Sequence, residues 1–270
     1  MIEKSIFDFG RPLIMAHRGE SGRTPENTML SLESAVALDV DVLESDVRLT
    51  KDNEIVLFHD DDLSRTTGRE GSIRSYTLDD ILQFDLGYTF TTDNGKSFPF
   101  RGKNLKIVTL QNAFERFPDV IFNLDIKDDF PSATSELAQL ISNMDRRKSV
   151  IVASFNGVQL ERFRELMPDV ATSAHPGEVQ KFVLNTKIGL PRIKRKDIQY
   201  RAFQVPIKSG PLTIVTRKFI SKAHEHNIAV HVWTINDEPT MNYLLEMGVD
   251  GIFTDQPSLL KQVLQKRGVL

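Results

Sequence analysis

Strand-like apolar runs alternate with segments of helical periodicity along almost the whole chain. We predict eight such strands, at residues 13–17, 42–49, 120–127, 150–155, 170–174, 202–206, 229–235 and 251–255. Each of them but the second is followed directly by a helix. This alternation implies a parallel sheet of the α/β class, and eight units imply a closed (β/α)8 TIM barrel. An open doubly wound sheet is disfavoured, because no G-x-G-x-x-G motif follows the first strand.

Helix boundaries and one long interruption complete this pattern. Thr24 is a predicted N-cap, with Pro25 at the first position of the first helix. A later helix is predicted over residues 237–247, with Gly248 as its stop. Between residues 60 and 106 turn residues and scattered aromatics replace the alternation, and this stretch is too long for a normal βα loop. We expect an inserted subdomain there, with one short helix near residues 78–84, within a single barrel domain spanning 1–270.

Length and composition narrow the class of protein. The chain has 270 residues, and single (β/α)8 barrels commonly have about 250. It has no cysteine, which excludes disulfides, thiolate metal sites and cysteine nucleophiles. A net charge of −3 gives no support for nucleic-acid binding. No run approaches the roughly 18 apolar residues of a membrane span, and the start lacks the pattern of a signal peptide. A cytoplasmic location is the expectation, although a trimmed leader would leave the same sequence.

Polar residues that could carry out chemistry are concentrated in the first two predicted strands and the hairpin that follows them. Glu44 and Asp46 stand at positions i and i+2 of a strand, so their side chains point to the same face. Two adjacent carboxylates repel each other unless a positive group lies between them, which indicates a divalent cation. The turn residues 50–53 predict a hairpin that brings His59 opposite these carboxylates. With His17 at the end of the first strand, we expect two imidazoles and a metal site together.

Three more charged residues are placed to join this site. Arg18 follows the first histidine, and its planar guanidinium is suited to phosphate. Asp125 and Lys127 alternate with apolar neighbours in a later strand, so both should face the barrel mouth. Asp125 would give three oxygen ligands with the two earlier carboxylates, a set suited to Mg²⁺ or Ca²⁺. Lys127 would bind the remaining phosphate charge. A structural ion pair at the barrel rim is the alternative for Asp125 and Lys127.

Trp233 is the only tryptophan and shares a strand face with His231. Its ring is predicted to pack against the organic part of a substrate, the alternative being packing inside the barrel. For His231, packing inside the barrel is the preferred interpretation.

Short motifs follow one another in a specific order from about residue 14 to 260. They are His17-Arg18-Gly19, Pro25-Glu26-Asn27-Thr28, Glu44-Ser45-Asp46-Val47, Thr50-Lys51-Asp52, His59-Asp60, Asn123-Leu124-Asp125-Ile126-Lys127, Ser154-Phe155, His231-Val232-Trp233-Thr234 and Gly248-Val249-Asp250-Gly251-Ile252-Phe253-Thr254-Asp255. Each is weak evidence by itself, but the ordered set is highly specific. It resembles the glycerophosphodiester phosphodiesterase family.

The resemblance implies a barrel hydrolase that cuts phosphodiesters of glycerol or related alcohols, using one divalent metal. By similarity, His17 and His59 would be the acid–base pair. Glu44, Asp46 and Asp125 would be the metal ligands, and Arg18 and Lys127 would bind the phosphate. Many relatives carry glutamate where this chain has Asp125, which leaves the preference between Mg²⁺ and Ca²⁺ open. The basic stretch 187–201 does not map onto the family pattern.

The chemistry of the residues agrees with this assignment. A phosphodiester is already anionic, so its hydrolysis needs charge neutralisation, a base and an acid for the leaving group. Two histidines with an ordinary pKa of about 6.5 can supply the base and the acid near neutral pH. Direct attack by water and attack by a neighbouring substrate hydroxyl, through a cyclic phosphate, both remain open.

Two other functions compete with this one. A lysophospholipase D would perform the same chemistry on a substrate with an acyl chain, and the basic residues 192–196 would then lie near anionic headgroups in a peripheral membrane contact. The aromatic and apolar residues of the insertion would line a groove for the tail, or else form the insertion's own core: Phe84, Leu86, Tyr88, Phe90, Phe98 and Phe100. A barrel that binds phosphodiesters without hydrolysing them is disfavoured, because both histidines and all three carboxylates are present. The sequence does not indicate an oligomeric state.

Overall fold

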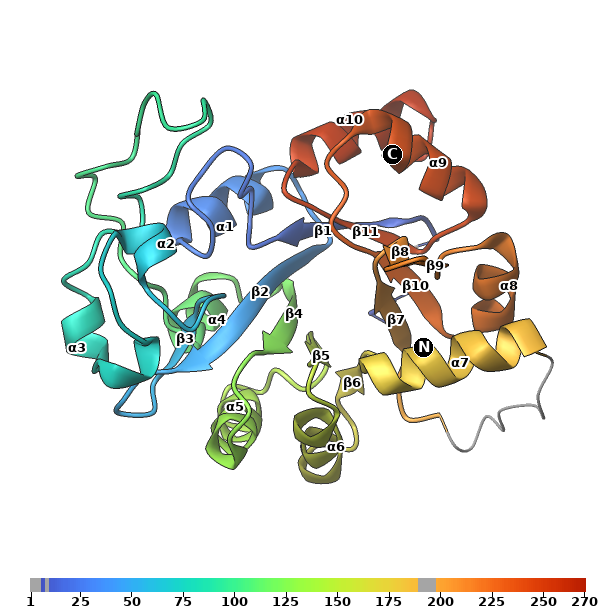
Figure 1. The fold of residues 1–270 in the computed structure, drawn as a ribbon, viewed down its shortest axis with the longest axis horizontal. Coiled ribbons are helices and arrows are strands. Elements are labelled where there is room, and N and C mark those ends of the chain that lie inside the picture. Colours follow the sequence, from blue (N-terminus) through green and yellow to red (C-terminus); the bar gives the residue numbers. More distant parts are fainter. Residues whose placement is uncertain (1–5, 8–9, 189–197) are drawn as a thin grey trace.

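The computed structural model describes residues 6–7, 10–188 and 198–270, which form a barrel of parallel strands surrounded by helices (Figure 1). The barrel strands are β1 (Leu13–His17), β2 (Val42–Leu49), β4 (Ile121–Ile126), β5 (Val150–Ala153), β6 (Ala171–Thr172), β7 (Ala202–Val205), β10 (Ala229–Val232) and β11 (Gly251–Thr254). They pair in the order β6-β5-β4-β2-β1-β11-β10-β7. The circle closes between its two ends, where Ser173 bridges to Ala202 in parallel. The predicted (β/α)8 barrel is confirmed.

Helices follow the barrel strands as the alternation predicts. They are α1 (Met29–Ala37), α4 (Leu110–Arg116), α5 (Pro131–Asn143), α6 (Gly157–Leu166), α7 (Pro176–Ile188), α8 (Arg217–Glu225), α9 (Glu238–Met247) and α10 (Pro257–Lys266). Gly248 ends α9 in the left-handed conformation, with φ of 88°, as predicted. None of the helices described combines the length and the apolar character needed to cross a bilayer.

Apolar side chains fill the barrel below its carboxyl end. Leu13, Met15, Val42 and Phe253 are buried together in one cluster. Met15 and Phe253 each stand two residues before a polar residue on the same face of a strand, as Val42 does before Glu44. The lower interior is therefore a packed, mainly apolar core, which also contains the buried His231, and Glu44 and the polar residues after Met15 and Phe253 lie toward the end where the strands finish.

The first helix begins later than predicted. Its N-cap is Thr28, whose side chain accepts a hydrogen bond from the backbone N–H of Ser31, and the predicted cap at Thr24 is wrong. Asn27 adopts a left-handed conformation, with φ of 55°, which cannot continue a helix started at Pro25. Thr28 also bridges to Ile107, a contact that no local pattern reports.

The hairpin after β2 is formed by β3 (Ile55–Leu57), which pairs antiparallel with β2. The N–H of Phe58 donates to the carbonyl of Asp46 at 2.9 Å, so His59 follows next to the carboxylates of β2 as predicted.

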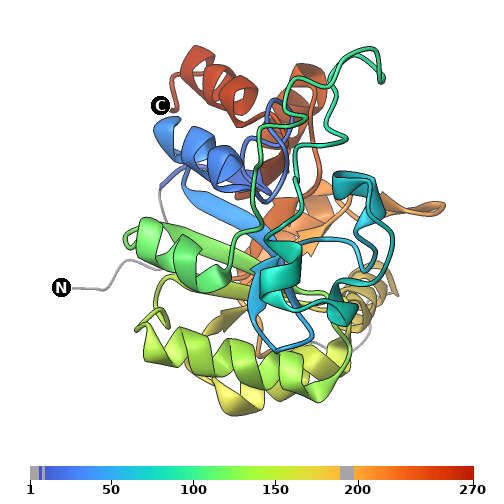
Figure 2. The same cartoon turned by 90° about the vertical axis from the view of Figure 1, so that its left-hand side faces the viewer.

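The insertion contains α2 (Ser64–Thr67), the 3₁₀ helix η1 (Ile73–Ser75) and α3 (Leu78–Ile81). Only α3 was predicted, near residues 78–84, and it is shorter than that range; α2 and η1 were not predicted. Leu63, Ile73, Ile81 and Leu86 form a small core of its own. Figure 2 shows the insertion, in teal and green, on one side of the barrel.

The aromatic side chains of the insertion pack mainly on one another. The rings of Phe90 and Phe100 meet edge to face with centroids 5.3 Å apart, and Arg101 lies over the rings of Tyr88 and Phe98. Leu86 is buried in the small core of the insertion and Phe84 packs against it, whereas Tyr88 is 43% exposed. The interpretation as the insertion's own core therefore fits Phe84 and Leu86.

A second hairpin, not predicted, follows β7. It consists of β8 (Lys208–Ser209) and β9 (Leu212–Thr213), which are too short to be recognised as strands in the sequence. The segment 187–201, expected to be a loop, lies largely outside the described residues, and α7 continues through its first two residues.

Candidate active site

A cavity of about 620 Å³ opens where the barrel strands end. Its lining includes all eight residues singled out in the sequence, which are His17, Arg18, Glu44, Asp46, His59, Asp125, Lys127 and Trp233. Seven of them come from the barrel strands or from the residues that directly follow them, and His59 follows β3 of the hairpin. The fold therefore gathers the predicted site residues into one cavity.

The register of β2 against β4 brings the carboxylates together. Asp46 stands directly opposite Asp125, and both are buried. The ammonium of Lys127 lies between them, 2.9 Å from Oδ1 of Asp46 and 2.6 Å from Oδ2 of Asp125. Burial opposes the charge on Lys127, but these two carboxylates outweigh it and raise the pKa of the amine. A positive charge is thus held at the centre of the site.

The two aspartates respond differently to the same surroundings. Burial and the neighbouring Asp46 raise the pKa of Asp125 despite Lys127. For Asp46, burial is outweighed by Arg18 and Lys127, and its pKa is lowered. Asp46 is therefore ionised more readily than Asp125.

Glu44 is fully enclosed beside the first histidine. Burial raises its pKa to about 7, against the effect of His17 and with that of Asp46. Its Oε2 accepts a hydrogen bond from the backbone N–H of Arg18 at 3.1 Å and lies 3.9 Å from Nε2 of His17. The charge of the Glu44 carboxyl group and the charge of the His17 imidazole therefore influence each other.

One carboxylate oxygen is left without a partner. Oδ1 of Asp125 is buried and accepts no hydrogen bond, whereas Oδ2 of Asp46 lies 3.0 Å from Nε of Arg18 in an ion pair. Among the described residues, no three histidine, aspartate or glutamate side chains are arranged as a metal site, and Lys127 bridges the two aspartates. The donor set itself fits a hard cation, since it consists of acceptor-only oxygens and Oδ1 of Asp125 is unsatisfied.

Arg18 is positioned by the backbone as much as by its partners. It adopts a left-handed conformation with φ of 58°, and its N–H donates to the carbonyl of Glu44 at 2.9 Å. The next residue, Gly19, has φ of 86°, and a Cβ there would lie 2.2 Å from the hydroxyl of Ser31. Only glycine fits this turn. The guanidinium is thereby directed to Asp46, 3.0 Å away, and to Glu26, 2.9 Å away.

His17 is held by Asp255, a residue that sequence reasoning did not single out. The Nδ1 atom lies 2.6 Å from Oδ1 of Asp255, which also accepts a hydrogen bond from the hydroxyl of Ser21. Asn236 donates to the other carboxylate oxygen at 2.6 Å. Burial opposes protonation of His17, but Glu44 and Asp255 outweigh it and raise its pKa. The only sequence signal was the place of Asp255 at the end of a recognised motif.

His59 is held in the same way by the residue that follows it. Its Nδ1 lies 2.6 Å from Oδ1 of Asp60. The other oxygen of Asp60 accepts from Nε of Arg65, on α2 of the insertion. Burial tends to raise the pKa of Asp60, but these two partners lower it. Each histidine therefore has an ionised carboxylate at Nδ1, which leaves Nε2 for chemistry. Arg65 gave no signal in the sequence.

One wall of the cavity is apolar. The ring of Trp233 meets that of Phe155 at a centroid distance of 5.8 Å, and Phe155 is 62% exposed. The rest of the wall comes from α7 and from the β8–β9 hairpin with the residues beside it, namely Pro176, Val179, Val183, Leu212 and Ile214. No aromatic residue of the insertion that the structure describes lines this cavity.

His231 lies in the barrel interior and not in the site. It is fully buried, and neither ring nitrogen has a hydrogen-bond partner. Its ring packs near those of Phe7 and Phe253. Burial lowers its pKa to about 4, so the imidazole is neutral near pH 7. This agrees with the preferred interpretation of His231 as a packing residue.

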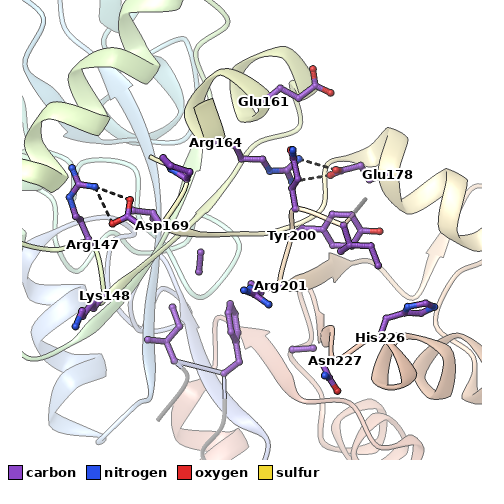
Figure 3. Close-up of a pocket in the computed structure, with 18 of the residues that line it drawn as sticks. Arg147, Lys148, Glu161, Arg164, Asp169, Glu178, Tyr200, Arg201, His226 and Asn227 are labelled. Carbon is purple, nitrogen blue, oxygen red and sulfur yellow. Dashed lines mark hydrogen bonds and ion pairs between the residues drawn. The ribbon is translucent and has the colours of Figure 1, made fainter. Parts of the chain in front are cut away.

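A larger cavity, of about 1510 Å³, lies where β6, β7 and β10 begin (Figure 3). Four of its charged residues are paired, Arg147 with Asp169 at 2.8 Å and Arg164 with Glu178 at 2.9 Å. None of the predicted site residues lines it. The predicted site residues therefore lie at the opposite end of the barrel from this cavity.

Comparison with known proteins agrees with this arrangement. Residues 17–259 match the glycerophosphoryl diester phosphodiesterase family. A glycerophosphodiester phosphodiesterase of Bacillus altitudinis is 30% identical over 248 residues, which are 90% of this chain and 94% of that protein. The lysophospholipase D GDPD3 of Homo sapiens is 26% identical over 274 residues, with 94% and 85% covered.

A solved structure supports the same relationship. A phosphodiesterase of Oleispira antarctica, in complex with the product sn-glycerol-3-phosphate, is 25% identical with a TM-score of 0.76. The match covers 97% of this chain and 100% of that one. The chain therefore belongs to the glycerophosphoryl diester phosphodiesterase family, a family of phosphoric diester hydrolases.

Proposed function

We propose that this protein hydrolyses glycerophosphodiesters to glycerol phosphate and an alcohol, by acid–base catalysis with two histidines and one divalent cation. One observation carries the proposal. His17 and His59 line the same cavity, and each has a carboxylate 2.6 Å from Nδ1. Such a partner fixes the ring and strengthens its basicity, so that Nε2 can move a proton. One histidine would take a proton from the nucleophile and the other would give one to the leaving alkoxide.

Glu44, Asp46 and Asp125 would hold the cation, Mg²⁺ or Ca²⁺. When bound, the cation would neutralise charge on the phosphate and lower the pKa of the attacking hydroxyl group. The buried, unsatisfied Oδ1 of Asp125 supports this assignment. Arg18 and Lys127 would bind the phosphate oxygens, since both cations line the cavity beside the carboxylates.

The glycerol phosphate part of the substrate is supported by the product found in the Oleispira antarctica relative. In this chain the rings of Trp233 and Phe155, inclined at 65° to each other, offer apolar surface next to Lys127, whose ammonium lies 5.6 Å from the centre of the Phe155 ring. Such a surface suits the carbon skeleton of a small alcohol beside a bound phosphate. A location in the cytoplasm stays a prediction.

The decisive experiment measures alcohol release by the purified protein. Glycerophosphocholine and glycerophosphoethanolamine are offered with Mg²⁺ or Ca²⁺, and choline or ethanolamine is quantified. We expect metal-dependent release of the alcohol together with glycerol phosphate. No hydrolysis of either substrate with either metal would reject the proposal.

A lysophospholipase D activity is the second candidate, and the apolar wall of the cavity favours it. An acyl chain needs contiguous apolar surface, and each buried CH₂ contributes about 0.8 kcal/mol. Val179, Val183, Leu212 and Ile214 provide such surface from α7 and the segment that contains β9. The human relative is named as a lysophospholipase D. Choline release from a lysophosphatidylcholine, in the same assay, decides between the two substrates.

A further inference from the structure

We propose that Arg65, on the first helix of the insertion, is a positioning residue that orients both His59 and Arg18. The inference rests on the proposed function, because it gives Arg65 a task in the same reaction. It is based on a chain of contacts in which the half-exposed guanidinium of Arg65 binds the carboxylate partners of two site residues.

The first branch of this chain leads to His59. Nε of Arg65 donates to Oδ2 of Asp60, while Oδ1 of the same carboxylate lies 2.6 Å from Nδ1 of His59. Each oxygen of the Asp60 carboxylate therefore has a partner, His59 at one and Arg65 at the other. Without Arg65, Asp60 keeps a single strong partner and can rotate about its side chain, and the imidazole loses its fixed direction.

The second branch leads to Arg18. Nη1 and Nη2 of Arg65 donate to the two carboxylate oxygens of Glu26, both at 2.7 Å. One of these oxygens, Oε1, also accepts from Nη1 of Arg18 at 2.9 Å. Glu26 is therefore a bridge between two guanidinium groups. Arg18 continues the chain to Asp46, 3.0 Å from its Nε.

Only arginine can make both branches. Its guanidinium presents five N–H donors in one plane, and here three of them serve two carboxylates from different segments of the chain. A lysine at position 65 would offer a single ammonium group, which cannot donate to Asp60 and to both oxygens of Glu26 as the planar guanidinium does. Because the side chain of Arg65 is 49% exposed, these ion pairs contribute little to overall stability. Their effect is on geometry.

Contacts within the insertion hold the segment that carries Arg65. The hydroxyl of Thr89, from the far part of the insertion, donates to the carbonyl of Thr66 at 3.0 Å. Leu63, just before α2, is fully buried in the small core of the insertion. We therefore infer that the insertion acts in catalysis by delivering one guanidinium, whereas its aromatic residues pack away from the cavity.

The first experiment compares Arg65→Ala with Arg69→Ala. Arg69 is a matched control, because it is an exposed arginine of the same insertion whose guanidinium lies 6.0 Å from the ring centre of Phe84. With glycerophosphocholine, Arg65→Ala should lower kcat about 10–100-fold, the usual effect of removing a group that orients a catalytic side chain. It should also raise KM, while Arg69→Ala should change neither. Equal kinetics of the two variants would overturn the proposal.

Double-mutant cycles then test the two branches separately. In an Asp60→Ala background the loss of Arg65 should no longer lower kcat, because the path to His59 is already broken. In a Glu26→Ala background it should no longer raise KM, because the path to Arg18 is broken. Full additivity in both cycles would mean that Arg65 acts in another way, and the proposal would fail.

Folding and binding measurements separate this inference from the proposed function. Thermal unfolding should be similar for all variants, and Arg65→Lys, which keeps the charge, should recover only part of kcat and KM. The affinity for inorganic phosphate, measured by calorimetry, should fall about 10-fold in Arg65→Ala and stay normal in Arg69→Ala. This result would support the positioning of Arg18 even if the wild-type protein hydrolysed no glycerophosphodiester. Unchanged phosphate affinity in Arg65→Ala would reject that branch whatever the activity.

Discussion

The carboxylate of Asp255 lies 2.6 Å from Nδ1 of His17, although 238 positions separate the two residues in the chain. They meet because β1 pairs with β11, where Ala16 stands opposite Thr254. Burial tends to raise the pKa of Asp255, but hydrogen bonds from His17, Asn236 and Ser21 lower it. Asp255 is therefore an acceptor, and Nδ1 of His17 carries the proton.

Asp255→Asn should lower kcat about 10–100-fold with little change in KM. Asparagine has the same size, but its amide can donate to Nδ1 and so move the ring proton to Nε2, the atom proposed to exchange a proton with the substrate. Steady-state kinetics with glycerophosphocholine check this expectation. A normal kcat in a correctly folded variant would show that His17 does not need this partner.

His17→Ala and His59→Ala should each lower kcat about 10²–10⁴-fold, because each removes a proton-transfer group. The activity of the wild-type protein should follow a bell-shaped pH profile. His224→Ala serves as the control, since His224 forms a similar pair with Asp250, at 2.8 Å, on the protein surface. If His59→Ala kept near-normal turnover, the acid–base assignment would be wrong.

Chelation by EDTA should abolish activity, and Mg²⁺ or Ca²⁺ should restore it. The three carboxylates would otherwise leave a partly unsatisfied anionic cluster at the reacting phosphate. Asp125→Glu lengthens one ligand by a methylene group and should change the ratio of activities with Mg²⁺ and Ca²⁺, because Mg²⁺ demands the stricter geometry. Full activity in a rigorously metal-free preparation would contradict the metal assignment.

Leu212→Ala should raise KM for a long-chain lysophospholipid and leave that for glycerophosphocholine unchanged. Loss of contact with three carbons would weaken binding roughly 50-fold, at about 0.8 kcal/mol for each CH₂. Tyr88→Ala is the matched control, since Tyr88 lies under Arg101 in the insertion and does not line the cavity. Similar effects of Leu212→Ala on both substrates would reject a tail site on this wall.

His231 should make the protein sensitive to acid. Its pKa of about 4 in the fold lies below the ordinary value of 6.5, so its contribution to stability is complete above pH 6.5 and is lost as the pH falls toward 4. The total loss is about 3 kcal/mol, of which about 2 kcal/mol appears by pH 5. Urea unfolding at pH 7 and pH 5 should show a smaller decrease for His231→Leu than for the wild type. Equal decreases would mean that His231 is not held neutral in the fold.

Most of the fold followed from local patterns in the sequence. Short, continuously buried apolar runs alternate with segments of period-3.6 burial, and these two patterns distinguish the barrel strands from the helices that cover them. Because parallel strands of a barrel all end on the same side, the strand pattern alone was enough to place the polar residues at the strand ends together. The hairpin placed His59 correctly for a similar reason, since its turn residues and strand lengths are local.

Tertiary contacts decided the partners of these residues. Asp255 reaches His17 only when the barrel closes. Arg65 reaches Glu26 only when the insertion packs against the loop before α1. The start of α1 depends on Asn27, whose unusual conformation accompanies a hydrogen bond from Ser45. Local periodicity carries no information on such pairs, because it reports burial and not which distant residue is the neighbour. The sequence alone therefore determined the barrel and the set of site residues, and the packed structure determined how each of them is held.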